Sequence, residues 1–195
     1  MTQFISWVSG HGLKRDYVGH NKISPQARLA VIASEDQLFA DHNGVIWKNI
    51  KKAIRYDLKK PGRTRGYSTI SQQVAKNVFL WQGRSWIRKG LEAYFTFMIE
   101  LLWGKKRILD VYLNVIEMGN GIFGIEMASK KYFNKHARDL NSQEAAMIAA
   151  CLPSPKRIRV KPPSTFVMNR ARAIMRQMSF LAPDPDIRRV AGMPP

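Results

Sequence analysis

A chain of 195 residues is long enough for one compact domain with its own core and too short for two comfortable ones. Its 32 lysines and arginines face 14 aspartates and glutamates, and the formal charge of +18 predicts an anionic partner: nucleic acid, an anionic membrane surface or a phosphate-bearing substrate. Because Cys151 is the only cysteine, an intrachain disulfide, a CxxC redox pair and a cysteine zinc cluster are excluded.

The sequence contains no convincing transmembrane helix or signal peptide. The apolar stretch at residues 93–103 is too short to cross a bilayer and contains Glu100, so it is predicted to be a core helix. The first residues lack the basic head, apolar middle and small-residue cleavage site of a signal peptide. We therefore expect neither an anchor nor a targeting segment within this chain.

The first half of the chain predicts two helices and a loop. Residues 25–36 begin with proline and keep apolar side chains on one side, which predicts a buried helix that ends at Glu35 and Asp36. Residues 45–58 place isoleucines at four-residue steps opposite lysines, a pattern typical of an amphipathic helix. Residues 59–67 combine proline, glycine and four basic residues without periodicity, so a loop is expected there.

Further helices follow at short intervals. Residues 68–80 read as a helix with a hydroxyl residue in the capping position and an apolar stripe. Residues 85–103 predict a longer amphipathic helix, and residues 105–119 another one that is ended by Gly119. Glycines then precede a short helical stretch that reaches residue 133, which suggests backbone packed close to a neighbour.

The last third is also helical. Asn141 and Glu144 form an Asn version of the capping box before the helix at residues 143–152, and a final helix is expected over residues 166–181. Nothing alternates like a strand for more than a few residues, and there is no internal repeat. The pattern predicts a mainly α fold in a single domain over residues 1–195.

Glu35 has two interpretations. It follows an apolar run and precedes the turn-like DHNG, so it is expected to lie partly desolvated at a cleft edge, the setting of a general base. Position alone favours the other interpretation, a helix-end carboxylate paired with one of the many bases. His42 is ambiguous in the same way, and without an HxxxH or HxH pair a zinc site is not expected.

The stretch GYSTISQQVAKN gathers hydroxyls, amides and an ammonium around the start of a helix. Such an end offers free backbone N–H groups and a favourable dipole, which suit a phosphate or sugar hydroxyls. An ordinary cap on a solvated helix explains part of the pattern equally well. The candidate ligands are Ser68, Thr69, Gln72, Gln73, Lys76 and Asn77.

The stretch IRKGLE places Arg88 and Lys89 within one helical turn of Glu92. One interpretation is a surface salt bridge. The other is a cationic clamp for a phosphate, in which the carboxylate orients the bases or holds a divalent metal, and which Arg84 and Lys105 would join. Sequence alone favours the salt bridge unless the segment lies in a cleft.

These stretches, taken in order with KKRILDVYLNVIEMGNGIFGIEMASKKYF and LNSQEAAMIAACLPSP, resemble the motifs of the peptidoglycan glycosyltransferases, family 51 among glycosyltransferases. The resemblance covers nearly the whole chain and is greatest with the monofunctional members, because no room is left for a transpeptidase domain. It implies a mostly helical, lysozyme-like fold with a small membrane-facing jaw subdomain at about residues 45–67. Members normally begin with a transmembrane helix, and no such helix is expected within these 195 residues.

The resemblance also implies a reaction: the polymerisation of lipid II, with a growing glycan on undecaprenyl pyrophosphate as donor and the GlcNAc 4-hydroxyl of lipid II as acceptor. Glu35 matches the catalytic base, and Glu92 matches the second essential glutamate, which orients bases or a divalent cation. No tightly bound cofactor is implied, and Mg²⁺ or Mn²⁺ is the candidate for Glu92. The residues that match substrate-binding positions are Asp36, Phe39, His42, Gly44, Ser68, Thr69, Gln72, Gln73, Lys76, Asn77, Arg84, Arg88, Lys89 and Lys105.

Further expectations follow from the resemblance. The protein is expected at the periplasmic face of a bacterial inner membrane, in contact with the membrane surface and with other cell-wall or division proteins, and sensitive to moenomycin. Tyr67 departs from the Gly or Ala usual before STI, and activity is expected to survive it. The basic loop at residues 59–65, with Trp47, Tyr56 and Trp81, is expected to face the membrane.

Rival functions stay open at this point. A lytic transglycosylase or lysozyme also uses a catalytic glutamate on a related fold, but cleavage of a neutral glycosidic bond has no use for a pyrophosphate clamp. A nucleic-acid-binding module fits the charge but shows no helix-turn-helix or RNP-like pattern, so no nucleic-acid partner is expected. A non-catalytic cell-wall scaffold is disfavoured by the presence of both Glu35 and Glu92.

Overall fold

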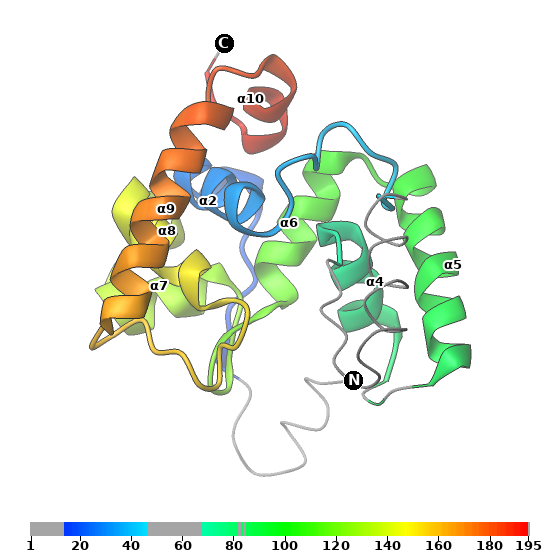
Figure 1. Ribbon diagram of the computed structural model, residues 1–195, viewed down its shortest axis with the longest axis horizontal. Coiled ribbons are helices and arrows are strands. Elements are labelled where there is room, and N and C mark those ends of the chain that lie inside the picture. Colours follow the sequence, from blue (N-terminus) through cyan, green and yellow to red (C-terminus); the bar gives the residue numbers. More distant parts are fainter. Residues whose placement is uncertain (1–13, 47–67, 82, 84, 195) are drawn as a thin grey trace, which may run out of the picture.

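A computed structural model describes residues 14–46, 68–81, 83 and 85–194 of the protein, with the side chains of Lys14 and Arg15 left aside. The described part is mainly helical, as expected (Figure 1). Residues 47–67 lie outside the described part, so the expected helix at 45–58, the basic loop after it and nearly all of the expected jaw stay predictions.

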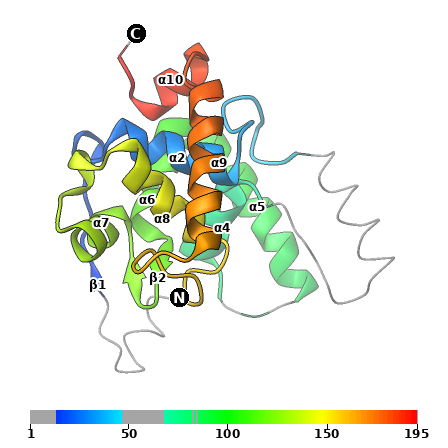
Figure 2. The same ribbon diagram turned by 60° about the vertical axis from the view of Figure 1, so that its left-hand side comes forward.

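The first group of helices surrounds α2 (Pro25–Glu35). The Ser24 hydroxyl caps this helix by accepting from the backbone N–H of Gln26, and proline occupies its first turn. Nearly all of α2 is buried, because it packs against α8 (Ser142–Cys151) and α9 (Thr165–Leu181) while α10 (Pro185–Ala191) closes over it. The view in Figure 2 shows α9 in front of this group with α10 at its end.

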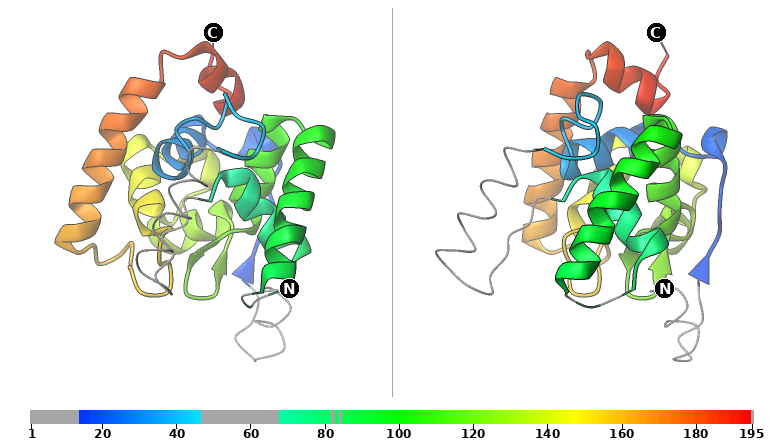
Figure 3. Two further views of the ribbon diagram at one scale, coloured as in Figure 1. Left: turned by 45° about the vertical axis from the view of Figure 1, so that its right-hand side comes forward. Right: turned by 90° about the vertical axis from the view of Figure 1, so that its right-hand side faces the viewer.

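The second group pairs α4 (Ile70–Phe79) with α5 (Trp86–Leu102). A capping box starts α4: the Thr69 hydroxyl accepts from the backbone of Gln72, whose side chain accepts from the backbone N–H of Thr69. Between the two groups lies α6 (Lys105–Val115), which packs on α4. Two views in Figure 3 show α5 on the outside of the molecule, at the edge opposite α9.

A small sheet lies beside α7 (Ile125–Phe133), with 3₁₀ turns at His20–Lys22 and Ala137–Asp139. The described strands β1 (Lys14–Arg15), β2 (Glu117–Gly119) and β3 (Ile122–Phe123) stand in the order β1-β3-β2. β3 pairs in parallel with β1, Ile122 opposite Lys14, and antiparallel with β2. None of these strands was predicted, because segments of two or three residues carry no readable alternation.

The predicted helix at 105–119 is wrong at its end. α6 stops at Val115, and the chain then turns into β2, because the backbone of Ile116 accepts from Gly124 across the hairpin. Gly119 sits in β2 where a Cβ would lie 2.0 Å from the Tyr132 hydroxyl, so it marks a tight packing contact and no helix C-cap. The helix at α10 was not predicted either, although Asp184 caps it through two backbone N–H groups.

Other predicted features are confirmed. The Asn141 and Glu144 side chains form the expected capping box of α8. Helices lie where the patterns of residues 25–36, 68–80, 85–103 and 166–181 predicted them, with ends shifted by one or two residues. Within the described residues, no helix is long and apolar enough to cross a membrane.

Candidate active site

Glu35 is the last residue of α2, and its half-buried carboxylate faces the start of α4. Oε2 accepts a hydrogen bond of 3.0 Å from the Gln73 side-chain amide, and Oε1 lies 3.2 Å from the Ser34 hydroxyl. These hydrogen-bonding partners are neutral donors. Among the described residues the carboxylate is therefore held by neutral donors, and a carboxylate in such surroundings can accept a proton.

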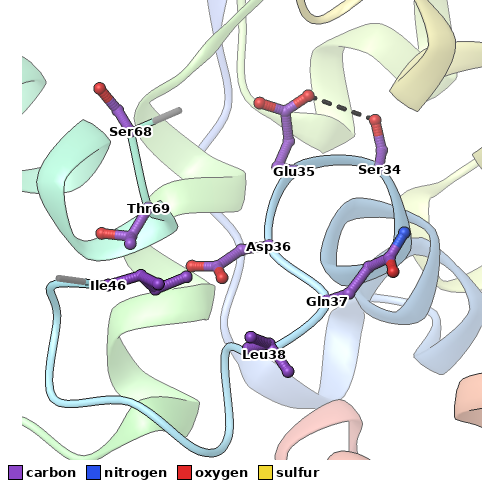
Figure 4. A pocket seen from close by; sticks show the side chains of 8 residues that line it. All are labelled: Ser34, Glu35, Asp36, Gln37, Leu38, Ile46, Ser68 and Thr69. Carbon is purple, nitrogen blue, oxygen red and sulfur yellow. Dashed lines mark hydrogen bonds between the residues drawn. The ribbon is translucent and has the colours of Figure 1, made fainter. Parts of the chain in front are cut away.

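A pocket of about 320 Å³ opens beside this carboxylate. In Figure 4, Glu35 and Ser34 lie on one side of it and Ser68 and Thr69 on the other, with Asp36 between them. The wall is mixed in chemistry, so it can hold both hydroxyl groups and the apolar face of a sugar ring. Its lining residues are Ser34, Glu35, Asp36, Gln37, Leu38, Ile46, Ser68 and Thr69.

Asp36 fixes the floor of the site. It is buried, accepts a hydrogen bond of 3.0 Å from the backbone N–H of Ile70, and lies 2.9 Å from Nε2 of His42. The backbone N–H of Gly44 donates to Nδ1 of the same imidazole at 3.0 Å, so Nδ1 carries no proton. Because Nδ1 accepts this hydrogen bond, Nε2 is the ring nitrogen that donates to Asp36.

The loop between α2 and α4 is packed tightly at Gly44. The Thr69 hydroxyl donates to its carbonyl at 2.6 Å, and its φ of +82° suits glycine. A Cβ on Gly44 would lie 2.7 Å from a Thr96 methyl group. Lys105 holds the same loop from α6: its ammonium donates to the His42 carbonyl and lies 4.8 Å from the ring centroid of the buried Phe39.

A second cluster lies where the outer end of α4 meets the start of α5. Glu92 is only 4% exposed, its Oε1 accepts from the Lys89 ammonium at 2.6 Å, and its Oε2 lies 3.8 Å from Arg88. Lys76 is exposed as a residue, but partial desolvation of its ammonium lowers its pKa; the charge of Glu92 opposes this effect, whereas the charges of Arg88 and Lys89 add to it. We refer to Lys76, Arg88, Lys89 and Glu92 as the cation cluster.

Helix α4 joins the two centres. Gln73, which contacts Glu35, and Lys76, which belongs to the cation cluster, are three residues apart and project from the same side of the helix. Their positions differ by about 4.5 Å along the helix axis. Helix α4 thus contacts the Glu35 carboxylate through Gln73 and contributes Lys76 to the cation cluster about one turn further along.

The cation cluster does not by itself make a metal site. The two carboxylate oxygens of Glu92 face Lys89 and Arg88, and the described residues contain no group of three or more acidic, histidine or cysteine side chains that could hold an ion. A divalent cation would need further oxygen ligands, since Mg²⁺ prefers six of them. The geometry fits Glu92 as the residue that orients the two cations.

The family model described as Transglycosylase matches residues 2–179 of this chain. The chain belongs to the transglycosylase family. The resemblance read from the motifs is confirmed, and the site lies among the residues that carry those motifs.

Biosynthetic peptidoglycan transglycosylases are among the curated proteins similar to this family member. One from Mannheimia succiniciproducens is 55% identical over 166 residues, which cover 85% of this chain and 68% of the relative. Those from Shigella boydii serotype 4 and Escherichia coli (strain K12 / DH10B) are each 50% identical over 186 residues, 94% of this chain and 77% of each relative. The expected enzyme class is confirmed, and neither the muramidase nor the scaffold alternative is favoured.

The residues predicted for this transglycosylase-family site fall into three places. Glu35, Asp36, Ser68 and Thr69 line the pocket. Lys76, Arg88, Lys89 and Glu92 form the cation cluster, and Arg84 lies outside the described residues. The remaining predicted residues have protein partners in the walls of the site: Phe39, His42, Gly44, Gln72, Gln73, Asn77 and Lys105.

Sequence reasoning missed two residues of the site. The Ser34 hydroxyl lies beside Glu35, and the Tyr112 hydroxyl donates to Oε1 of Gln73 at 3.2 Å. Tyr112 stands in the apolar stripe of α6, where a tyrosine is easily read as ordinary core. The signal was its hydroxyl, because a buried tyrosine needs a hydrogen-bond partner.

Proposed function

We propose that this protein is a peptidoglycan glycosyltransferase that polymerises lipid II, with Glu35 as the base and the cation cluster as the binding site of the pyrophosphate. The observation that carries this proposal is the arrangement around α4: Gln73 holds the Glu35 carboxylate, and Lys76, about one turn further along the helix, belongs to the cation cluster. Its relatives are biosynthetic peptidoglycan transglycosylases, and their names support the same substrate class.

The chemistry needs one base. The 4-hydroxyl oxygen of the acceptor GlcNAc attacks C1 of the donor sugar, and its proton passes to Glu35. The bond between C1 and the phosphate oxygen breaks, and its electron pair leaves with undecaprenyl pyrophosphate. Attack opposite the leaving group converts the α linkage to β in one displacement.

The departing group explains why the second centre is cationic. A glycosidase must protonate a leaving alkoxide, whereas a pyrophosphate leaves as a stable anion and needs only positive charge beside it. Lys76, Arg88 and Lys89 supply that charge, and Glu92 keeps the two α5 cations in place. A divalent ion carried in with the substrate phosphates would act at the same place.

Fluorescent lipid II in detergent tests the proposed function. The wild-type chain is expected to form a ladder of products on a gel that muramidase digestion removes, and Glu35→Gln is expected to form none. Circular dichroism of both proteins establishes that they are folded. Equal polymer from wild type and Glu35→Gln would contradict the role of Glu35, and shortened glycan strands in place of polymer would favour a lytic enzyme.

We propose that the outer face of α5 contacts the membrane that carries lipid II, at the periplasmic side of the inner membrane. Large apolar side chains on this face are exposed, led by Trp86 at 90%, Ile87 at 75% and Leu102 at 68%. Trp81, expected to face the membrane, precedes the same face and is 40% exposed. Arg88 and Lys89 of the cation cluster lie in the first turns of α5. Basic and apolar side chains therefore lie next to each other on this helix, as they do in helices that bind at a membrane interface.

Vesicle flotation tests this membrane contact. Changing Trp86, Ile87 and Phe97 together to serine is expected to weaken binding to anionic phospholipid vesicles about tenfold or more, since each exposed apolar side chain contributes burial in the interface. Phe166 and Phe180 on α9 are similarly exposed at the opposite edge, so their replacement by serine is the matched control. Equal loss in both variants would contradict a specific role of α5.

A further inference from the structure

We propose that Tyr112 and Gln73 act as positioning residues for Glu35, in a hydrogen-bonded relay that runs from the buried core through α4 to one oxygen of the carboxylate. The relay rests on the proposed function, in which Glu35 is the base. It gives Gln73 a role different from the substrate binding expected from its motif.

The relay is built from two hydrogen bonds across three helices. The Tyr112 hydroxyl on α6 donates to Oε1 of Gln73 at 3.2 Å, and Nε2 of Gln73 on α4 donates to Oε2 of Glu35 at 3.0 Å. The second hydrogen on Nε2 points to the Ser68 carbonyl at 3.5 Å. Tyr112 is 1% exposed, so the relay begins at a side chain that the core holds still.

The direction of each hydrogen bond is fixed by chemistry. Burial first, and then the charges of Glu35 and Asp36, raise the pKa of Tyr112 well above its ordinary value, so its hydroxyl stays protonated. The hydroxyl therefore donates, and the group on Gln73 that receives it must be the carbonyl oxygen. This leaves Nε2 facing the carboxylate and the Ser68 carbonyl, which are both acceptors.

Positioning makes the two oxygens of Glu35 unequal. Oε2 is held by Gln73, whereas Oε1 has a weaker contact with the Ser34 hydroxyl at 3.2 Å. That hydroxyl has one hydrogen and a second acceptor, the Ala149 carbonyl at 3.3 Å. Ser34 can turn its hydrogen to Ala149 when the acceptor sugar arrives, so Oε1 is the oxygen that takes the proton.

The same contacts argue against Gln73 as a substrate ligand. Its carbonyl receives Tyr112, and its amide hydrogens are directed to Glu35 and Ser68. A sugar or phosphate oxygen would have to break one of these bonds to reach it. Loss of the relay should therefore lower kcat and change KM little, because substrate contacts remain while the base is less well placed.

The test is a double-variant cycle of Tyr112→Phe and Gln73→Met in lipid II polymerisation, with kcat and KM measured across pH. Each single variant is expected to lose about tenfold in kcat, and the double variant no more than Gln73→Met alone, because Tyr112 acts only through Gln73. The acidic limb of the kcat profile is expected to move to higher pH, because the ionised carboxylate loses a donor. Tyr132→Phe is the control, since its hydroxyl bonds the Met118 carbonyl elsewhere.

The outcomes distinguish a failure of the relay from a failure of the proposed function, in which Glu35 is the base. A kcat and acidic limb of Tyr112→Phe equal to wild type, or losses that multiply in the double variant, would overturn the relay while Glu35→Gln still stops turnover. Turnover in Glu35→Gln equal to wild type would overturn the proposed function and the relay together. If Tyr112→Phe is unstable by thermal melting, Gln73→Met alone carries the test through its pH profile and its ratio of kcat to KM.

Discussion

Two glutamates in a strongly basic protein have opposite surroundings. Glu35 lies at the end of α2 with the neutral donors Ser34 and Gln73, whereas Glu92 lies at the start of α5 between Lys89 and Arg88. A carboxylate held by neutral groups can still accept a proton, and one held by cations serves as their counterion. The different neighbours thus suit the two glutamates to the opposite tasks proposed for them.

The two regions also differ in how they are held. The floor beside Glu35 is fixed by short internal hydrogen bonds and close packing, from Asp36 through His42 to Gly44. In the cation cluster the Lys89 side chain is 55% exposed, although it contacts a buried carboxylate. Proton transfer requires fixed geometry, whereas a diffuse pyrophosphate charge tolerates movable cations.

Breaking the cation cluster should have the largest effect. Glu92→Gln is expected to lower turnover about 100-fold or more with the fold intact, because Lys89 and Arg88 lose the charge that orients them. Lipid II turnover and circular dichroism measure the two quantities. Glu144→Gln is the control, since Glu144 pairs with Lys135 at the start of α8. Near-normal activity of Glu92→Gln would remove Glu92 from the mechanism.

A change in the packed floor beside Glu35 should have a smaller effect, and it should act on stability. Gly44→Ala is expected to lower the free energy of unfolding by about 2 kcal/mol, because its positive φ and the contact with Thr96 both oppose a Cβ. Gly90→Ala on α5 is the matched control, since a Cβ there meets nothing within 4 Å and alanine favours a helix. Thermal melting of both variants measures the difference. Equal melting temperatures of Gly44→Ala and Gly90→Ala would contradict tight packing around Gly44.

The smallest effect is a shift in pH dependence. The pKa of Lys76 is lowered, so its ammonium loses its proton at a lower pH than an ordinary lysine as the solution becomes alkaline. Lys76→Arg keeps the charge throughout this range and is expected to move the alkaline limb of the turnover profile to higher pH. Lys106→Arg, on an exposed part of α6, is the control. Coinciding alkaline limbs would show that Lys76 does not limit activity there.

Much of this arrangement was readable in the sequence, because its signals are local. The apolar run before Glu35 predicted the end of α2, and the spacing of Arg88, Lys89 and Glu92 predicted their contacts on one helical face. The Asn141 capping box was equally local. The sequence could not decide whether Arg88, Lys89 and Glu92 form a phosphate-binding clamp or a surface salt bridge. Both interpretations use the same contacts between these three side chains.

The remainder depends on contacts between distant segments. Tyr112 and Gln73 are 39 residues apart, and the sequence predicted Gln73 as a substrate ligand because nothing local shows that α6 approaches α4 there. The end of α6 was misread for a similar reason. The apolar pattern of α6 continues past Val115, so the sequence predicts a longer helix. The residues that follow pair with β3 as strand β2 instead, and this pairing ends the helix.

The measurement that tests the central claim most directly compares ligand binding with turnover in Glu35→Gln. This variant is expected to bind undecaprenyl pyrophosphate as tightly as wild type and to form no glycan from lipid II, since the cation cluster is intact and the base is absent. Lys76→Ala should show weaker binding in the same titration. Loss of undecaprenyl pyrophosphate binding in Glu35→Gln, or glycan formation at the wild-type rate, would contradict the division of tasks between the two centres.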